Sequence, residues 1–259
     1  MKKLFFLLAV SALVFSCNKD QPATTVNLHF KALYDGAPLV MNGQYKYPDA
    51  SGNLIMIQQF NFYISDMVLV DENGGETKLL DVDFVDFTNN TTTAEAETPA
   101  TFILPKIPTG TYTGLHISIG VPADKNKASA NQLSVGNPLR DTYSTHFWSD
   151  WGSFIFMKSE GIYDYDQDGV IENNGDDHPY GHHCGTNESY VALSFDKPIL
   201  LEENKPTGLN FVVDLLRLYA NEDSVLDFGD TANLYTQSPN DLALAKKIMS
   251  NFHFALTLE

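Results

Sequence analysis

The chain has 259 residues, of which 43% are hydrophobic and 19% are charged, and this composition excludes a wholly disordered protein. Sixteen Lys and Arg residues stand against 33 Asp and Glu residues, and the formal charge is −17. This charge argues against a nucleic-acid partner, because a phosphate backbone requires a basic surface. Two cysteines are too few for a disulfide-rich scaffold.

Residues 1–17 are typical of a bacterial lipoprotein signal peptide. Lys2 and Lys3 form a positive segment, and residues 4–15 form an apolar run that is too short to span a bilayer. Cys17 follows the small residue Ser16, as in a lipobox, so we expect cleavage before Cys17 and its lipidation. An ordinary secretory signal with an incidental cysteine is the alternative. Cleavage leaves 14 Lys and Arg residues against 33 acidic ones, a formal charge of −19 before the termini.

The predicted location is the cell envelope, with the lipid chains on Cys17 as the contact with the membrane. Asn18, rather than Asp, follows the cysteine and favours the outer membrane, on its periplasmic side or at the cell surface. Residues 18–25 are polar and contain Pro22, which indicates a short tether. No linker-like change of composition follows, so residues 26–259 are predicted to form one domain.

Short β-strands are predicted along most of this domain. Residues 26–33 alternate apolar and polar side chains, the period-two pattern of a half-buried strand. Asn42-Gly43 predicts a hairpin between residues 39–41 and 44–47. Further strands are predicted at 55–70, 78–85, 101–104, 110–121, 151–160, 190–195, 199–200 and 209–216.

Three stretches, 89–99, 123–145 and 161–185, are polar and predict loops. Apolar residues at helical spacing predict one helix, over residues 240–250. About ten short strands and one late helix indicate an all-β fold, an antiparallel β-sandwich with a short C-terminal helix.

Residues 164–172 match the first nine positions of an EF-hand calcium loop, in which Gly169 allows the sharp turn. Position 12 is Gly175 rather than Glu, so Asp176 or Asp177 would complete the loop. Because three alternating carboxylates repel one another without a cation, we predict a calcium site; an acidic solvated loop is the alternative. The predicted ligands are Asp164, Asp166, Asp168, Val170, Glu172 and Asp176.

Three histidines and a cysteine lie within residues 178–184, a pattern that favours a soft-metal site, with ordinary loop histidines as the alternative. His182 and His183 are adjacent, so on an extended chain they point to opposite faces and share an ion only if the chain bends. His146 and Trp148 precede the strand 151–160. If that strand neighbours 190–195, these residues approach the histidines where the long loop folds back.

Enzyme signatures are absent from the sequence: it has no Gly-x-Ser-x-Gly, phosphate loop, His-Glu-x-x-His or dinucleotide fingerprint. We therefore expect a protein without catalysis of its own. A hydrolase that uses the acidic loop is one alternative, and a structural cell-surface lipoprotein stabilised by calcium is another.

Several segments in a fixed order resemble the MbnP-like copper-binding family of periplasmic or lipidated β-proteins. Where that family has Met-x-Trp-x-Trp, this chain has His146, Trp148 and Asp150 at the matching positions. The resembling segments are Phe60–Leu69, Ile107–Tyr112, Ile119–Asn126, Asn137–Leu139 leading to Phe147-Trp148, Phe154–Gly161 and His183–Gly185.

The resemblance implies copper binding or homeostasis beside a diheme cytochrome c peroxidase-type partner. It also implies that Trp148 matches a tryptophan that such a partner can oxidise to kynurenine. Copper prefers imidazole ligands, so we expect His183 to bind it, with His182 and His146 as the next candidates and His29 as a distant one.

Overall fold

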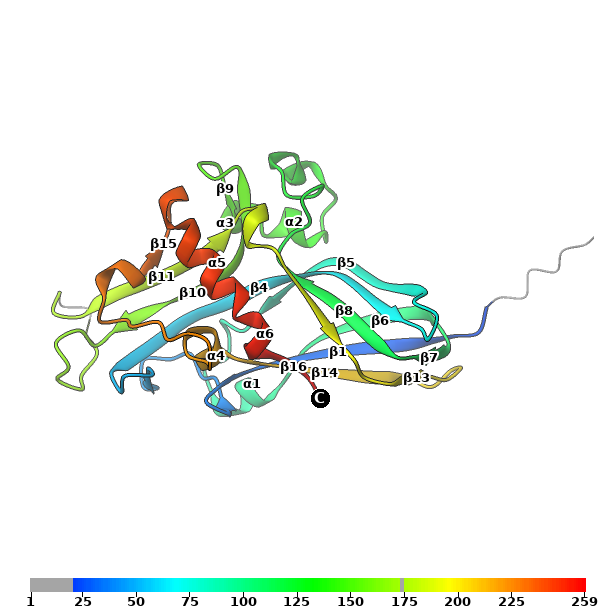
Figure 1. The fold of residues 1–259 in the computed structure, drawn as a ribbon, viewed down its shortest axis with the longest axis horizontal. Coiled ribbons are helices and arrows are strands. Elements are labelled where there is room, and N and C mark those ends of the chain that lie inside the picture. The colour runs from blue at the N-terminus through cyan, green and yellow to red at the C-terminus, as the bar shows by residue number, and fades with distance from the viewer. Residues whose placement is uncertain (1–20, 173–174) are drawn as a thin grey trace, which may run out of the picture.

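The computed structural model describes residues 21–172 and 175–259, which form two packed sheets with a short two-stranded ribbon (Figure 1). The predicted signal peptide, Cys17 and residues 18–20 of the predicted tether lie outside the described residues. Within the described ranges, no helix has both the length and the hydropathy that crossing a bilayer requires.

The smaller sheet has the strand order β16-β14-β1-β2, with β6 also paired to β1. Strand β1 alternates buried and half-buried residues, as its sequence predicts, and Phe30 stacks on Phe211 of β14 at a ring distance of 4.7 Å. Strand β1 starts three residues before the predicted domain does. The strands are β1 (Ala23–Tyr34), β2 (Ala37–Pro38), β6 (Ala100–Pro108), β14 (Thr207–Asp214) and β16 (Leu256–Leu258).

The larger sheet has the order β12-β8-β4-β10-β11-β15, and β3, β5 and β9 pair with its central strands. Buried side chains of both sheets form one contiguous core. The strands are β3 (Tyr47–Pro48), β4 (Leu54–Val70), β5 (Glu76–Asp86), β8 (Gly114–Ile119), β9 (Phe147–Trp148), β10 (Ser153–Tyr163), β11 (His178–Gly185), β12 (Val191–Phe195) and β15 (Tyr235–Thr236). The ribbon consists of β7 (Gly110–Tyr112) and β13 (Ile199–Leu201).

The all-β sandwich is confirmed, but its sheets are mixed rather than purely antiparallel as predicted, because β1 pairs with β14 and β11 pairs with β15 in parallel. Helix α5 (Leu242–Ser250) confirms the predicted C-terminal helix. The remaining helices are short: α1 (Thr93–Glu97), α2 (Pro138–Asp141), α3 (Tyr143–His146), α4 (Leu215–Tyr219) and α6 (Phe252–Ala255). Single 3-10 turns cover Ala128–Gln132, Asn187–Ser189, Thr231–Asn233 and Pro239–Asp241.

The hairpin predicted at Asn42-Gly43 does not form. The Tyr47 hydroxyl accepts a hydrogen bond from the Val40 amide at 2.7 Å and donates one to the Val40 carbonyl at 2.9 Å. Because this side chain takes the backbone groups of Val40, the segment folds around a tyrosine instead of forming a ladder.

The predicted loop 161–185 is instead a hairpin. Strand β10 continues to Tyr163, β11 starts at His178, and the two strands pair in antiparallel register. Strand β12 pairs with β8, on the far side of β4, so the strands predicted at 151–160 and 190–195 are not neighbours. The histidines of 178–184 therefore lie on a strand, whose register fixes the direction of each side chain.

Candidate metal centre

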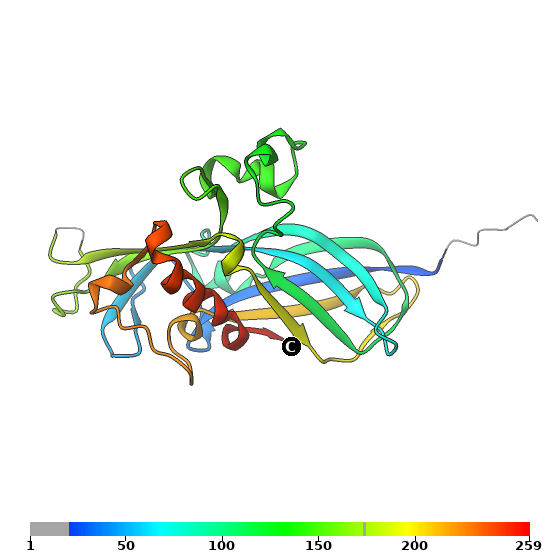
Figure 2. The same ribbon diagram turned by 45° about the horizontal axis from the view of Figure 1, so that its top comes forward.

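Residues 122–152 leave the larger sheet and stand above its outer face, where they carry α2, α3 and β9 (Figure 2). Strand β9 returns to the sheet by pairing with the start of β10, with Trp148 opposite Ser153. This excursion brings His146 and Trp148 over strands β4, β10 and β11.

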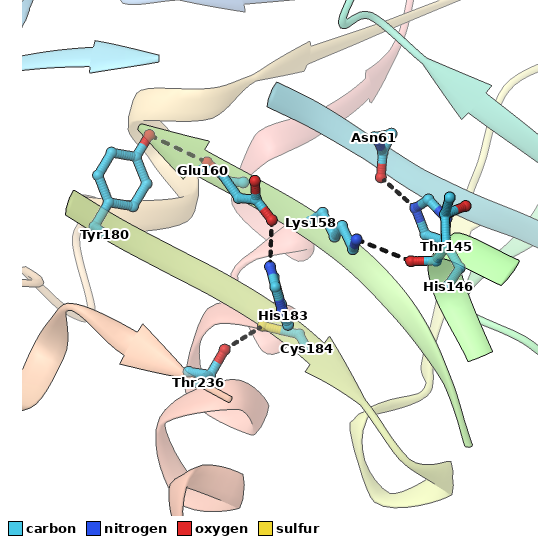
Figure 3. Close-up of polar contacts among 10 residues, drawn as sticks. Asn61, Thr145, His146, Lys158, Glu160, Tyr180, His183, Cys184 and Thr236 are labelled. Atoms are coloured by element: carbon cyan, nitrogen blue, oxygen red, sulfur yellow. Dashed lines mark hydrogen bonds and ion pairs between the residues drawn. The ribbon is translucent and has the colours of Figure 1, made fainter. Parts of the chain in front are cut away.

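The centre of the site is a contact between His183 of β11 and Glu160 of β10 (Figure 3). Lys158 pairs with His183 in the register, so Glu160, two residues further along β10, shares that face of the sheet. The His183 Nε2 atom contacts the Glu160 Oε1 atom, and the hydrogen bond from His183 lowers the pKa of the Glu160 carboxyl group. The other ring nitrogen, Nδ1, is buried and has no hydrogen-bond partner.

Two stacked indoles lie beside this imidazole. The ring centres of Trp148 and His183 are 5.6 Å apart, with the ring planes at 63°. Trp151 stacks on Trp148 at 5.4 Å and 11°, and its buried Nε1 atom has no hydrogen-bond partner. The predicted neighbour of the metal, Trp148, is therefore next to the first predicted ligand.

His146 approaches the same face from α3, but both of its nitrogens have partners. The Nε2 atom lies 3.1 Å from the Asn61 Oδ1 atom, and the Nδ1 atom lies 2.8 Å from the Thr145 Oγ1 atom. Burial, with a contribution from the Lys158 cation, lowers the pKa of His146 to about 3, so the ring stays neutral. A neutral imidazole can bind a metal ion, but His146 must first give up one hydrogen bond.

His182 points to the opposite face of β11 from His183, because successive strand residues alternate. It is fully buried, with Nε2 at 2.8 Å from the Asn233 carbonyl oxygen and Nδ1 at 3.1 Å from the Tyr219 hydroxyl. Cys184 is buried among apolar residues, and burial raises the pKa of its thiol to about 12. The structure therefore does not bring His182 and His183 together.

His29 lies on β1 in the other sheet, where its Nδ1 atom is 2.9 Å from the Thr101 hydroxyl oxygen. The structure therefore does not bring this distant candidate to His183, because β1 pairs with β14, β2 and β6 rather than with β11.

Sequence reasoning missed Glu160 and Lys158. The alternation of Lys158, buried Ser159 and Glu160 was the available signal, since it places two charged side chains on one face of a buried strand. The Lys158 Nζ atom donates to the Thr145 carbonyl oxygen at 2.9 Å, which connects β10 to the excursion that carries His146.

The second candidate centre is the loop between β10 and β11. One carboxylate oxygen each from Asp164, Asp166 and Asp168 lie within 4.8 Å of one another. Asp164 is 2% exposed; its Oδ2 atom accepts from the Gly169 amide at 3.0 Å, whereas its buried Oδ1 atom has no hydrogen-bond partner.

Other predicted ligands of this loop are placed differently. Asp177, rather than Asp176, is buried, and it accepts from the Tyr165 amide at 3.0 Å and the Glu172 amide at 2.7 Å. Glu172 and Asp176 are exposed and lie outside the group of three carboxylates. Val170 was predicted to offer its backbone carbonyl oxygen, and the exposure of its side chain does not affect that role.

The fold is a mixed β-sandwich, so the chain is an all-β protein. Its outer face carries a candidate transition-metal centre, where the unpartnered Nδ1 atom of His183 lies in a ring beside Trp148. The MbnP family model matches residues 23–238, so the chain belongs to the MbnP family, which is associated with copper. Among solved structures, MbnP from Methylosinus trichosporium is similar, with 18% sequence identity, a TM-score of 0.46, and coverage of 85% of this chain and 86% of that chain. No curated protein sequence matches the chain.

Proposed function

We propose that this protein binds copper outside the cytoplasm and carries or stores it there, without catalysis of its own. The observation that carries the proposal is the buried Nδ1 atom of His183, which has no hydrogen-bond partner and belongs to a ring beside Trp148. A buried nitrogen without a partner is costly unless something binds it, and imidazole suits copper.

His146 is the candidate for a second nitrogen ligand. Its ring is neutral and lies on the same outer face as His183. If His146 gives up one of its two hydrogen bonds, the nitrogen released can bind the metal. His182 and His29 do not support the proposal, since one faces the core and the other lies in the other sheet.

Copper titration against a competing chelator tests this function. We expect His183→Ala to abolish stoichiometric binding, because it removes the open nitrogen, with the far-ultraviolet circular dichroism spectrum unchanged. The matched control is His116→Ala, since His116 is a half-exposed histidine on β8, 3.9 Å from Glu76. Equal copper affinity in His183→Ala and the wild type would refute the assignment.

The remaining parts of the proposal rest on the resemblance and on the sequence of residues 1–17. We infer a lipid anchor at Cys17, an outer-membrane location and a diheme peroxidase-type partner that oxidises Trp148. Trp148 is only partly buried, which supports access by such a partner. Mass spectrometry of protein from the native host tests both modifications, and an unmodified Cys17 and Trp148 would contradict them.

A calcium-stabilised structural role is the second candidate, and the observation that favours it is Asp164. Its buried Oδ1 atom lacks a hydrogen-bond partner and lies in the group with the carboxylates of Asp166 and Asp168. Carboxylate oxygens are the ligands that calcium prefers. This role and copper binding use separate parts of the β10–β11 hairpin and are compatible.

A further inference from the structure

The contact between Glu160 and His183 is fixed by the pairing of the two strands that carry these residues. The two residues lie on neighbouring strands and on one face, and the His183 side chain is 13% exposed while that of Glu160 is 35% exposed. Lys158, the other charged residue on this face of β10, donates to the Thr145 carbonyl oxygen. The Glu160 carboxylate is therefore directed to the imidazole.

The backbone beside Glu160 has little freedom. The register between β10 and β4 shifts between Glu160 and Gly161. A Cβ atom at Gly161 would lie 2.0 Å from the Met56 carbonyl oxygen and 2.7 Å from the Tyr180 ring, so the strands approach closely only because this residue is glycine. This close approach fixes where the Glu160 side chain leaves the strand.

The two nitrogens of His183 have unequal surroundings, and this decides where the ring proton is stable. An ionised carboxylate only accepts hydrogen bonds, so a proton on Nε2 has an acceptor in Glu160. A proton on Nδ1 would be a buried donor without a partner, at a cost of about 1–3 kcal/mol. The neutral ring is therefore stable with its proton on Nε2 and its lone pair on Nδ1.

We propose that Glu160 is a positioning residue that holds His183 in the Nε2–H tautomer and so presents Nδ1 as the nitrogen that binds copper. The inference rests on the copper function proposed above and assigns the ligand atom within that site. A carboxylate that accepts the second N–H of a ligating histidine fixes the orientation of the ring and raises its basicity.

The tautomer is measured without metal, so this part of the test does not depend on copper binding. Long-range proton–nitrogen correlation spectra of protein with nitrogen-labelled histidine separate the two tautomers, and His183→Gln assigns the signals. We expect the Nε2–H form in the wild type and a larger share of the Nδ1–H form in Glu160→Ala, because that variant loses the acceptor of the Nε2 proton. A wild-type ring with its proton on Nδ1, or an unchanged tautomer in Glu160→Ala, overturns the proposal.

Copper affinity is then compared among three variants. Glu160→Ala should weaken binding by roughly 10–100-fold, the usual effect of losing such a partner. Glu160→Gln keeps a carbonyl oxygen that accepts from Nε2, so we expect a clearly smaller loss. The control is Glu76→Ala, which removes the carboxylate of the exposed pair with His116 and should leave copper affinity unchanged.

The outcomes separate this inference from the function on which it rests. A wild type that binds no copper refutes the proposed function, and the tautomer spectra still decide the role of Glu160. If Glu160→Gln loses as much affinity as Glu160→Ala, Glu160 acts as a direct ligand and the positioning role is wrong. Thermal denaturation of each variant shows whether it is folded.

Discussion

Three histidines of this chain have different chemistry because their surroundings differ. His183 has one nitrogen held by Glu160 and one that is buried and unpartnered. His146 and His182 each have partners at both nitrogens, and burial lowers the pKa of each ring. Only the first of these arrangements offers a lone pair without breaking a hydrogen bond.

The buried ring of His182 should make the protein sensitive to acid. Burial lowers the pKa of His182 from its ordinary value of 6.5 to about 4. Between these two pH values the ring is protonated in the unfolded chain and neutral in the folded chain. The contribution of the neutral His182 ring to the free energy of unfolding is therefore fully present above about pH 6.5 and is lost as the pH falls toward 4. A shift of this size corresponds to at most about 3 kcal/mol.

Urea unfolding between pH 7 and pH 4 measures this loss. His182→Gln keeps polar atoms that can reach Tyr219 and Asn233 but has no titrating ring, so its unfolding free energy should fall less steeply. The control is His253→Gln, which replaces an exposed histidine of α6. Parallel pH profiles for His182→Gln and the wild type would contradict the assignment.

At the level of single residues, the sequence indicated which side chains could bind a metal ion, but it did not indicate which side chains each of them contacts. Alternation along a strand is local, so the opposite directions of His182 and His183 followed from their adjacency. The contact of His183 with Glu160 depends on how two strands pair across the loop 164–177, and local patterns do not specify that register.

The β10–β11 hairpin is the element that joins both candidate centres. Its strands carry Glu160 and His183, and its connecting loop carries Asp164, Asp166 and Asp168. Because Asp164 comes directly after the last residue of β10, an ion held by the loop would order the end of the same strand that positions Glu160.

Calcium should raise the melting temperature of the wild type, and a chelator should lower it. An ion that binds only the folded state adds about 2.7 kcal/mol of stability at a hundredfold excess over its dissociation constant. Asp164→Asn keeps an oxygen for the Gly169 amide but loses the charge, so its calcium response should be much smaller. Differential scanning calorimetry with calcium and with EDTA measures both responses.

Asp124→Asn is the matched control for this change, since Asp124 is an acidic residue that is 76% exposed and lies far along the chain from the loop. It should respond to calcium as the wild type does. If the wild-type melting temperature is the same in calcium and in EDTA, the loop is a solvated acidic turn and the calcium role is wrong.

Strands and the C-terminal helix were predictable where the pattern is local and strong. Helix α5 follows a capping box at Ser238 and Asp241, and its buried residues have helical spacing. The hairpin at Asn42-Gly43 failed because a side chain, Tyr47, took the hydrogen bonds that a ladder needs. A turn motif in the sequence indicates where the chain bends, but it does not indicate which segments the residues before and after the turn pair with.

The arrangement of the whole molecule depends on contacts between distant segments. Strand β1 pairs in parallel with β14, which brings Val26 opposite Thr207. The all-β class followed from the number of short strands, but this pairing did not, because apolar alternation says which face is buried and not which strand lies beside it.

The net negative charge is a property of the whole molecule, and it predicts how the melting temperature depends on salt concentration. Acidic residues outnumber basic ones two to one, so net repulsion opposes the folded state. The exposed ion pairs, such as Arg217 with Glu222 at 3.9 Å, contribute little that salt could remove. Screening of the repulsion should therefore prevail, and the melting temperature should rise as salt is added.

The experiment is calorimetry at pH 7 in EDTA, with sodium chloride raised from 0.01 to 0.1 M, a range over which the screening length falls from about 30 to about 10 Å. EDTA keeps divalent ions from stabilising the acidic loop. Choline chloride at equal ionic strength is the control, since screening depends on ionic strength and specific sodium binding does not. A melting temperature that is flat or falls with salt would show that exposed ion pairs outweigh the repulsion, and a rise in sodium alone would point to a bound ion.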